Sequence, residues 1–102
     1  MDEAVQLIEQ ALEVEPDNGS YLDSLGWAYY KQGKLPEARR YLQRAADLLR
    51  SNSVIQDHLG DVLVALNDGP AAIAAWERAL AGDGESIDPA AIKSKIDRAR
   101  QR

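Results

Sequence analysis

The sequence predicts an all-α protein built from a repeated pair of helices, and three observations carry this prediction. Shifting the 102-residue chain by 34 positions aligns residues 17–50 with residues 51–84 and gives eight identical pairs, where chance would give roughly two. Within each copy, apolar residues recur at three- and four-residue steps, which is the period of a helix. No segment of useful length alternates with a period of two, so we expect no sheet.

The repeat divides a single domain into four parts. The identical pairs are Asn18/Asn52, Asp23/Asp57, Leu25/Leu59, Gly26/Gly60, Pro36/Pro70, Ala38/Ala72, Arg44/Arg78 and Ala45/Ala79. A further shift of 34 residues matches the start of the chain to the second half of a repeat, for example Ala4 to Ala38. We predict the second helix of a partial repeat over residues 1–16, full repeats over 17–50 and 51–84, and a capping helix over 85–102.

Each full repeat contains two helices joined by a turn. In the first copy, Gly33 ends the first helix and Leu35-Pro36 begins the second, since proline fits the first turn of a helix. The apolar positions of the first helices are Leu22, Leu25, Ala28 and Tyr29 in one copy and Val54, Ile55, Leu59, Val62 and Leu63 in the other. Those of the second helices are Ala38, Tyr41, Leu42, Ala45, Ala46 and Leu49, and Ala72, Ile73, Trp76, Ala79 and Leu80.

Two glycines occupy the same phase of the two repeats, Gly26 and Gly60, inside the predicted first helices. Glycine in a helix interior costs about 1 kcal/mol relative to alanine. Its recurrence at this position therefore predicts a close helix approach that leaves no room for a Cβ atom. Alanines spaced seven apart on the second helices predict similarly tight packing, with Leu42 and Trp76 filling the gaps.

The two ends of the chain differ. Residues 82–88 form a loop, and Asp88-Pro89 reads as the N-cap and first residue of a helix over 89–101. One face of this helix is apolar, with Ile92, Ile96 and Ala99. Its charged residues lie elsewhere, on the outside of a capping helix, and they are Lys93, Lys95, Asp97, Arg98 and Arg100.

The predicted first helix, over residues 2–14, has no preceding helix to cover one of its faces. The residues that we expect to be exposed there are Ala4, Leu7, Ile8, Ala11 and Leu12. We therefore expect Met1 to be a start within a longer array. Because a repeat array needs about three units for stability, these residues are also candidates for self-association as a homodimer.

The repeat resembles the tetratricopeptide repeat family over about residues 1–84. With Gly19 as the first repeat position, the matching sites are Leu22, Leu25, Gly26, Tyr29, Ala38, Leu42 and Ala45, then Leu59, Gly60, Leu63, Ala72, Trp76 and Ala79, with Ala4, Ile8, Ala11 and Pro16 in the partial repeat. The departures are Gln56 at an apolar site, and Arg50 and Gly84 where proline is usual. Residues 21–30 and 58–61 are similar to the C-terminal repeats of long bacterial members. The resemblance implies a location either in the cytoplasm or, in bacteria, in a periplasmic or outer-membrane-anchored protein.

The resemblance implies a right-handed superhelix whose concave groove, lined by the first helix of each repeat, binds a protein or peptide. The candidate contact residues lie on the face of those helices away from the signature sites, and they are Asp23, Trp27, Tyr30, Asp57, His58 and Asp61. We expect the two aromatic rings to anchor the partner and the aspartates to favour a basic or neutral one. The alternative is that both rings pack against a neighbouring repeat.

Some members of the family clamp the C-terminal carboxylate of chaperones with Lys and Asn side chains on the first helix of a repeat. Asp23 and Trp27 stand at these sites here, and Asp57 and Asp61 stand at them in the next repeat. Since carboxylates repel a carboxylate, we do not expect this chain to bind chaperone tails.

Composition and motifs argue against the other functional classes. A net charge of −5 with no basic run disfavours nucleic-acid binding, and no apolar run approaches the roughly 18 residues of a membrane helix. The chain has no cysteine and one histidine, His58, too few ligands for structural zinc. No nucleophile, base and orienting group occur together in a motif. We therefore expect no metal, cofactor or enzymatic activity, and predict an interaction scaffold, with structural self-association as the alternative.

Overall fold

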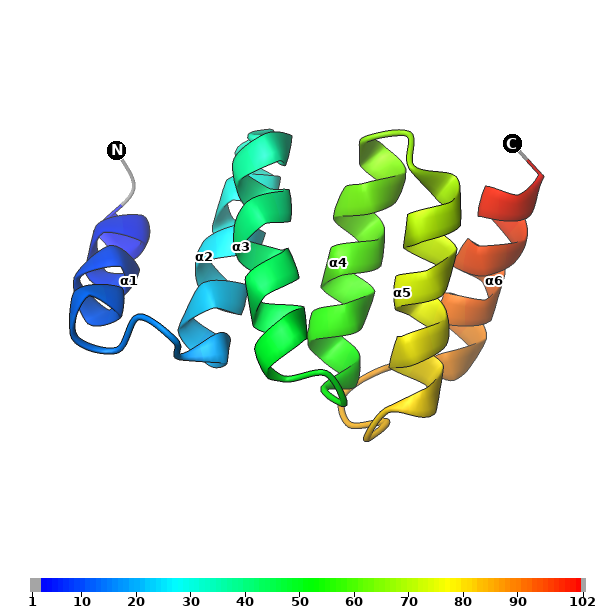
Figure 1. Ribbon diagram of the computed structural model, residues 1–102. Helices are drawn as coiled ribbons and strands as arrows, with labels where there is room; N and C mark the ends of the chain where they lie inside the picture. Colours follow the sequence, from blue (N-terminus) through cyan, green and yellow to red (C-terminus); the bar gives the residue numbers. More distant parts are fainter. Residues whose placement is uncertain (1–2, 102) are drawn as a thin grey trace.

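The computed structural model describes residues 3–101, and these residues form six helices without a strand. In chain order the helices are α1 (Glu3–Val14), α2 (Gly19–Lys31), α3 (Leu35–Leu48), α4 (Ser53–Ala65), α5 (Gly69–Ala81) and α6 (Pro89–Arg100) (Figure 1). The prediction of an all-α repeat protein is confirmed. Over the same residues, no helix is both long and apolar enough to cross a membrane.

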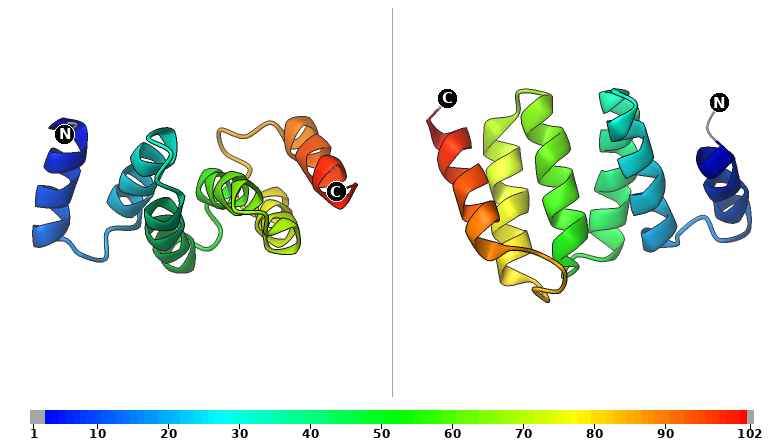
Figure 2. Two further views of the ribbon diagram at one scale, coloured as in Figure 1. Left: turned by 90° about the horizontal axis from the view of Figure 1, so that it is seen from above. Right: turned by 180° about the vertical axis from the view of Figure 1, so that it is seen from behind.

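The helices stack in the order of the chain. α2 packs against α3 and α4 against α5, while α3–α4 and α5–α6 contacts join the pairs and α1 packs against α2. Seen from above, α2, α4 and α6 lie along one side of the stack, and α3 and α5 lie along the other (Figure 2, left). We call the side formed by α2, α4 and α6 the inner face.

Polar side chains cap the start of α2, α4 and α6, whereas α3 begins without a side-chain cap. Asn18 accepts a hydrogen bond from the Tyr21 amide at 3.0 Å, and the equivalent Asn52 accepts one from the Ile55 amide at 3.1 Å. Asp88 caps α6 directly before Pro89, as the sequence predicted. Each such bond satisfies a backbone donor that the first turn of a helix leaves without a partner.

The turns inside the two repeats share one unusual backbone conformation. Gly33 has a φ of 78°, and Asn67, which stands 34 residues later, has a φ of 64°. This left-handed region is favoured by glycine and, among other residues, by asparagine. The same turn geometry therefore reverses the chain in both helix pairs, although the residue differs.

Close contact at Gly26 and Gly60 is confirmed. A Cβ atom on Gly26 would lie 2.6 Å from Leu42 Cγ, and one on Gly60 would overlap the indole of Trp76. Both partners are buried, and they belong to the continuous core that runs from α2 to α6. The missing side chains thus let each first helix lie directly on the large residue of its second helix.

The polar residue at an apolar family site is fully buried, and both polar atoms of its side chain are hydrogen-bonded. Gln56 donates from Nε2 to the Arg50 carbonyl at 3.0 Å, and its Oε1 accepts from Arg78 Nε at 3.1 Å. Hydrogen bonding offsets the cost of burying an amide. The departure from the family pattern at Gln56 is therefore compatible with the packing of α4.

Candidate functional site

The inner face carries a row of three stacked rings, Tyr30, Trp27 and His58, which we call the ring row. Trp27 and Tyr30 lie one turn apart on α2, with ring centroids 4.7 Å apart and planes inclined by 19°. His58 comes from α4 and stacks on Trp27 at 3.9 Å and 16°. All three residues are half-buried. The ring row thus packs across two repeats while it remains partly open to solvent.

Asp23 fixes the imidazole of His58. His58 Nδ1 lies 2.8 Å from Asp23 Oδ1, and because an ionised carboxylate only accepts hydrogen bonds, Nδ1 is the donor. The side chains are 21% and 18% exposed. Three of the predicted contact residues, Asp23, Trp27 and His58, therefore form one connected cluster between α2 and α4.

The other two predicted aspartates are joined by a residue that the sequence analysis placed on the outside. Asp57 and Asp61, one turn apart on α4, accept hydrogen bonds from Lys95 Nζ of α6 at 2.9 and 3.0 Å. Lys95 is 27% exposed at its side chain. Its placement on the outside of the capping helix is therefore wrong, because α6 turns this residue toward α4.

Burial and hydrogen bonding act in opposite directions on this cluster. Burial would lower the pKa of Lys95, but its hydrogen bonds to Asp57 and Asp61 outweigh that effect and raise the pKa above its usual value. Burial raises the pKa of Asp61, and the hydrogen bond from Lys95 offsets this only in part. The ammonium group is thus held firmly charged, whereas Asp61 ionises less readily than an exposed aspartate.

A hollow of about 470 Å³ borders the ring row on the side of α1. Its lining combines Trp27 and His58 with residues of α1 and α2, namely Ala4, Ile8, Asp23, Ser24, Ala28, Lys31 and Gln32. Ala4 and Ile8, which the sequence analysis assigned to self-association, therefore face the same space as the predicted contact residues. The lining thus combines charges of both signs, on Asp23 and Lys31, with apolar and uncharged polar side chains.

The remaining predicted self-association residues are covered unequally. Leu7 is 65% exposed, whereas Ala11 is half-buried and Leu12 packs against the core. Val5, which the sequence analysis did not single out, is fully buried, and Val14 is 83% exposed. α1 therefore turns Val5 and Leu12 inward and leaves Leu7 and Val14 as its large exposed apolar residues.

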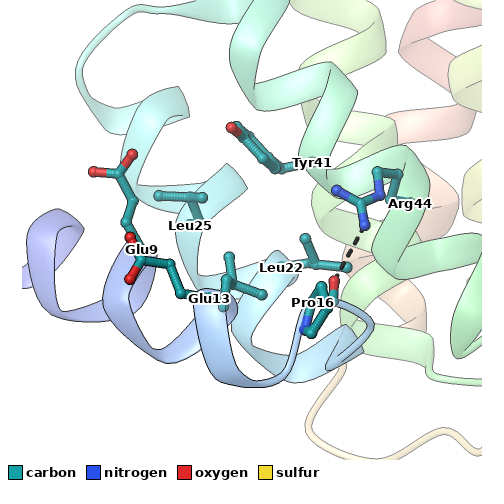
Figure 3. A pocket seen from close by; sticks show the side chains of 8 residues that line it. Glu9, Glu13, Pro16, Leu22, Leu25, Tyr41 and Arg44 are labelled. Atoms are coloured by element: carbon teal, nitrogen blue, oxygen red, sulfur yellow. Dashed lines mark hydrogen bonds between the residues drawn. The ribbon is translucent and has the colours of Figure 1, made fainter.

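A second hollow, of about 300 Å³, lies between α1, α2 and α3 (Figure 3). Glu9 and Glu13 come from α1 and Tyr41 and Arg44 from α3. Arg44 Nη2 donates to the Pro16 carbonyl at 3.1 Å, which ties α3 to the connection between α1 and α2. This hollow contains none of the predicted groove residues.

The missed residue, Lys95, follows the repeat period. Trp27, Asp61 and Lys95 are spaced 34 residues apart, so α6 stands in phase with the first helices of the two full repeats. Extending the period past residue 84 could have placed Lys95 on the inner face. Across residues 3–101, no three His, Asp or Glu side chains are arranged to hold a metal ion.

A comparison with protein families matches residues 1–53 to the family model described as tetratricopeptide repeat. A curated relative, TPR repeat-containing protein PA4667 of Pseudomonas aeruginosa, is 44% identical over 59 residues, which are 58% of this chain and 10% of the relative. The chain thus spans about a tenth of the length of that curated protein.

Solved structures show the same fold. The Sgt2 TPR domain from Aspergillus fumigatus matches with a TM-score of 0.84 and 24% identity, over 95% of this chain and 64% of that one. The first TPR of Spaghetti (RPAP3), bound to the HSP90 peptide SRMEEVD, matches with a TM-score of 0.87 and 21% identity, over 98% and 77%. These likenesses agree with the order and packing of the helices described above.

Proposed function

Because the chain belongs to the tetratricopeptide repeat family, we propose that its inner face binds a peptide or protein segment and that the chain serves as a scaffold or adaptor. The observation that carries the proposal is the ring row beside the hollow at α1 and α2. Half-buried aromatic residues in a preformed concave surface supply contact area at little ordering cost, which is typical of anchors in binding interfaces.

The charges beside the ring row favour a basic or neutral partner. Asp23, Asp57 and Asp61 all lie on the inner face, and the chain carries a net charge of −5. A partner with an apolar side chain for the hollow and a cationic side chain nearby would complement both features. Acidic segments would meet repulsion at the same place.

The structure of Spaghetti with the peptide SRMEEVD supports peptide binding as a use of this fold. The peptide itself is a poor candidate here, because it is acidic and this inner face carries three carboxylates. We propose that the chain discriminates against such tails by charge.

The test is a peptide selection followed by binding measurements. Twelve-residue peptides displayed on phage would be selected against the full chain, and the affinity of the enriched peptides measured by calorimetry. We expect Trp27→Ala to weaken their binding about tenfold or more, since anchor residues typically contribute at least this much.

Tyr21→Ala is the matched control, because Tyr21 is an exposed aromatic residue of the same helix that lies outside the ring row. It should leave the affinity unchanged. Equal affinities of the original chain and Trp27→Ala for every enriched peptide would remove the ring row as the binding surface.

Self-association is the second candidate function, and the exposure of α1 favours it. Of the large apolar residues within 3–101, Leu7 and Val14 are the two most exposed, and α1 packs principally against α2. A second copy that covered α1 would remove this apolar surface from water.

A further inference from the structure

Two carboxylates on the inner face hold an ammonium group that the chain itself supplies. Lys95 Nζ lies 2.9 Å from Asp57 Oδ1 and 3.0 Å from Asp61 Oδ1. Asp57 and Asp61 are four residues apart on α4, so both carboxylates point to the same side of the helix. Their side chains are 21% and 20% exposed, which limits screening by water and salt.

The surroundings of these carboxylates suit a primary ammonium in general. The ring centroid of Trp76 lies 6.0 Å from Lys95 Nζ. A hollow of about 230 Å³ opens beside it, and its lining consists of Asp61, Val64, Trp76, Lys95, Arg98 and Ala99. Two carboxylates with an aromatic ring at this distance form the kind of environment that binds lysine side chains. The pair carries one more negative charge than Lys95 neutralises.

The occupant comes from the helix that ends the stack. α6 lies beside α4 on the inner face, and Lys95 stands one repeat length after Asp61. A partner that follows the inner face from the ring row toward α6 would reach Asp57 and Asp61 after His58, because His58 contacts Trp27 of α2 whereas the two aspartates contact Lys95 of α6. The ammonium of Lys95 therefore lies on the path of such a partner.

We propose that Asp57 and Asp61 form a binding site for a lysine side chain of the partner, and that Lys95 occupies this site in the free protein as an internal competitor. The proposal rests on the proposed function and deepens it, because it specifies a partner segment that carries a lysine in addition to its apolar anchor. A partner lysine gains the site only when Lys95 leaves it, so the contact lowers the apparent affinity.

The experiment compares two variants of α6 that lose the same charge. Lys95→Gln empties the site, whereas Lys93→Gln removes an exposed lysine of the same helix that lies outside the carboxylate pair. The probe is fluorescent hexalysine, blocked at both ends, measured by anisotropy at low salt. We expect Lys95→Gln to bind it roughly fivefold more tightly than both the original chain and Lys93→Gln.

The gain should disappear when Asp57→Asn and Asp61→Asn are added to Lys95→Gln. Equal affinities of Lys95→Gln and Lys93→Gln would overturn the proposal, because general attraction to an acidic protein rises equally in both variants. Circular dichroism of each variant shows whether α6 remains folded.

A measurement on the unmodified chain covers the case in which Lys95→Gln loosens α6. Hexalysine should shift the NMR resonances of the Lys95 side chain during a titration, because it displaces that ammonium. Unchanged Lys95 resonances at saturation would overturn the proposal.

The two proposals fail separately. Trp27→Ala should leave hexalysine binding unchanged, since Trp27 stacks on the rings of Tyr30 and His58, whereas the carboxylate pair binds the Lys95 ammonium. Failure of the ring row as an anchor would appear with the selected peptides and Trp27→Ala, whereas failure of the lysine site would appear with hexalysine and Lys95→Gln.

Discussion

The contact between Gly60 and Trp76 shows how one absent side chain sets the distance between two helices. Trp76 is 2% exposed, and its indole lies over Gly60. In the first repeat, the equivalent glycine is Gly26, and it contacts Leu42 instead. Among residues 3–101, no group accepts a hydrogen bond from the buried Trp76 Nε1 atom. An unpaired indole N–H costs stability, so the packing of the large ring has to outweigh that cost.

We expect Gly60→Ala to lower the free energy of unfolding by about 2 kcal/mol, because the new Cβ would force the Trp76 indole out of its position. Urea denaturation of the two proteins measures the difference. Gly69→Ala is the control, since a Cβ there would meet only the Ala99 carbonyl at 3.8 Å. It should change stability by less than about 1 kcal/mol, and a similar loss at both sites would contradict the argument.

At the scale of helices, the partial burial of Asp61 on α4 gives the protein a specific response to acid. The pKa of Asp61 is raised above its ordinary value because the carboxyl group is buried. A raised folded-state pKa means that the folded chain takes up this proton more readily than the unfolded chain. The contribution of Asp61 to stability therefore increases as the pH falls through the mildly acidic range toward 3.8.

We expect the stability difference between the original chain and Asp61→Asn to shift in favour of the original chain on going from about pH 7 to about pH 4.5. Urea denaturation of both proteins at the two values measures the shift. The amide cannot titrate, and the carboxyl groups that do not interact with Asp61 cancel in the comparison. A difference that stays constant or moves the other way would show that burial does not control this carboxyl group.

Helix α6 shows which structural features of a helix can be predicted from its own sequence. Asp88-Pro89 indicated the start of α6, and Ile92, Ile96 and Ala99 indicated its buried face, and both predictions are confirmed. Lys95 was placed wrongly because a capping helix was expected to have only a polar outside. Its true position depends on the rotation of α6 against α4, which the apolar pattern of α6 alone leaves open.

At the scale of the whole molecule, the first and last helices of the stack differ in how much apolar surface they leave exposed. α6 covers one end and is tied to α4 through Lys95, while α1 leaves Leu7 and Val14 exposed at the other. Leu7 is the residue to change in a test of self-association, because its side chain is exposed. Ile8 and Leu12, which the sequence analysis also assigned to that surface, are half-buried within the chain, so changing them would disturb α1 itself.

We expect Leu7→Glu to abolish any dimer that forms through α1, because a dimer interface would have to bury the new charge. Sedimentation velocity over roughly a hundredfold range of concentration measures the association of both proteins. Ser94→Glu serves as a control for one added negative charge, since Ser94 is an exposed residue of α6, away from α1. An original chain that remains monomeric throughout would remove self-association as a function.

The candidate site was predicted in part. Asp23, Trp27, Tyr30, Asp57, His58 and Asp61 were chosen because they share the inner side of the first helices, and the structure brings Tyr30, Trp27, His58 and Asp23 into one cluster. Their role in binding stays a prediction. The expectation that the rings pack and the expectation that they bind are not exclusive, because the ring row is stacked across repeats and still half-exposed.

The sequence by itself determined the helices, their turns and the close contacts at Gly26 and Gly60. These features depend on period, capping and side-chain size, which are local properties that recur every 34 residues. Only the tertiary structure decided the partners of the charged groups: His58 with Asp23, and Lys95 with Asp57 and Asp61. Such pairs join residues 34 to 38 positions apart, and their geometry depends on how each helix is rotated against the next.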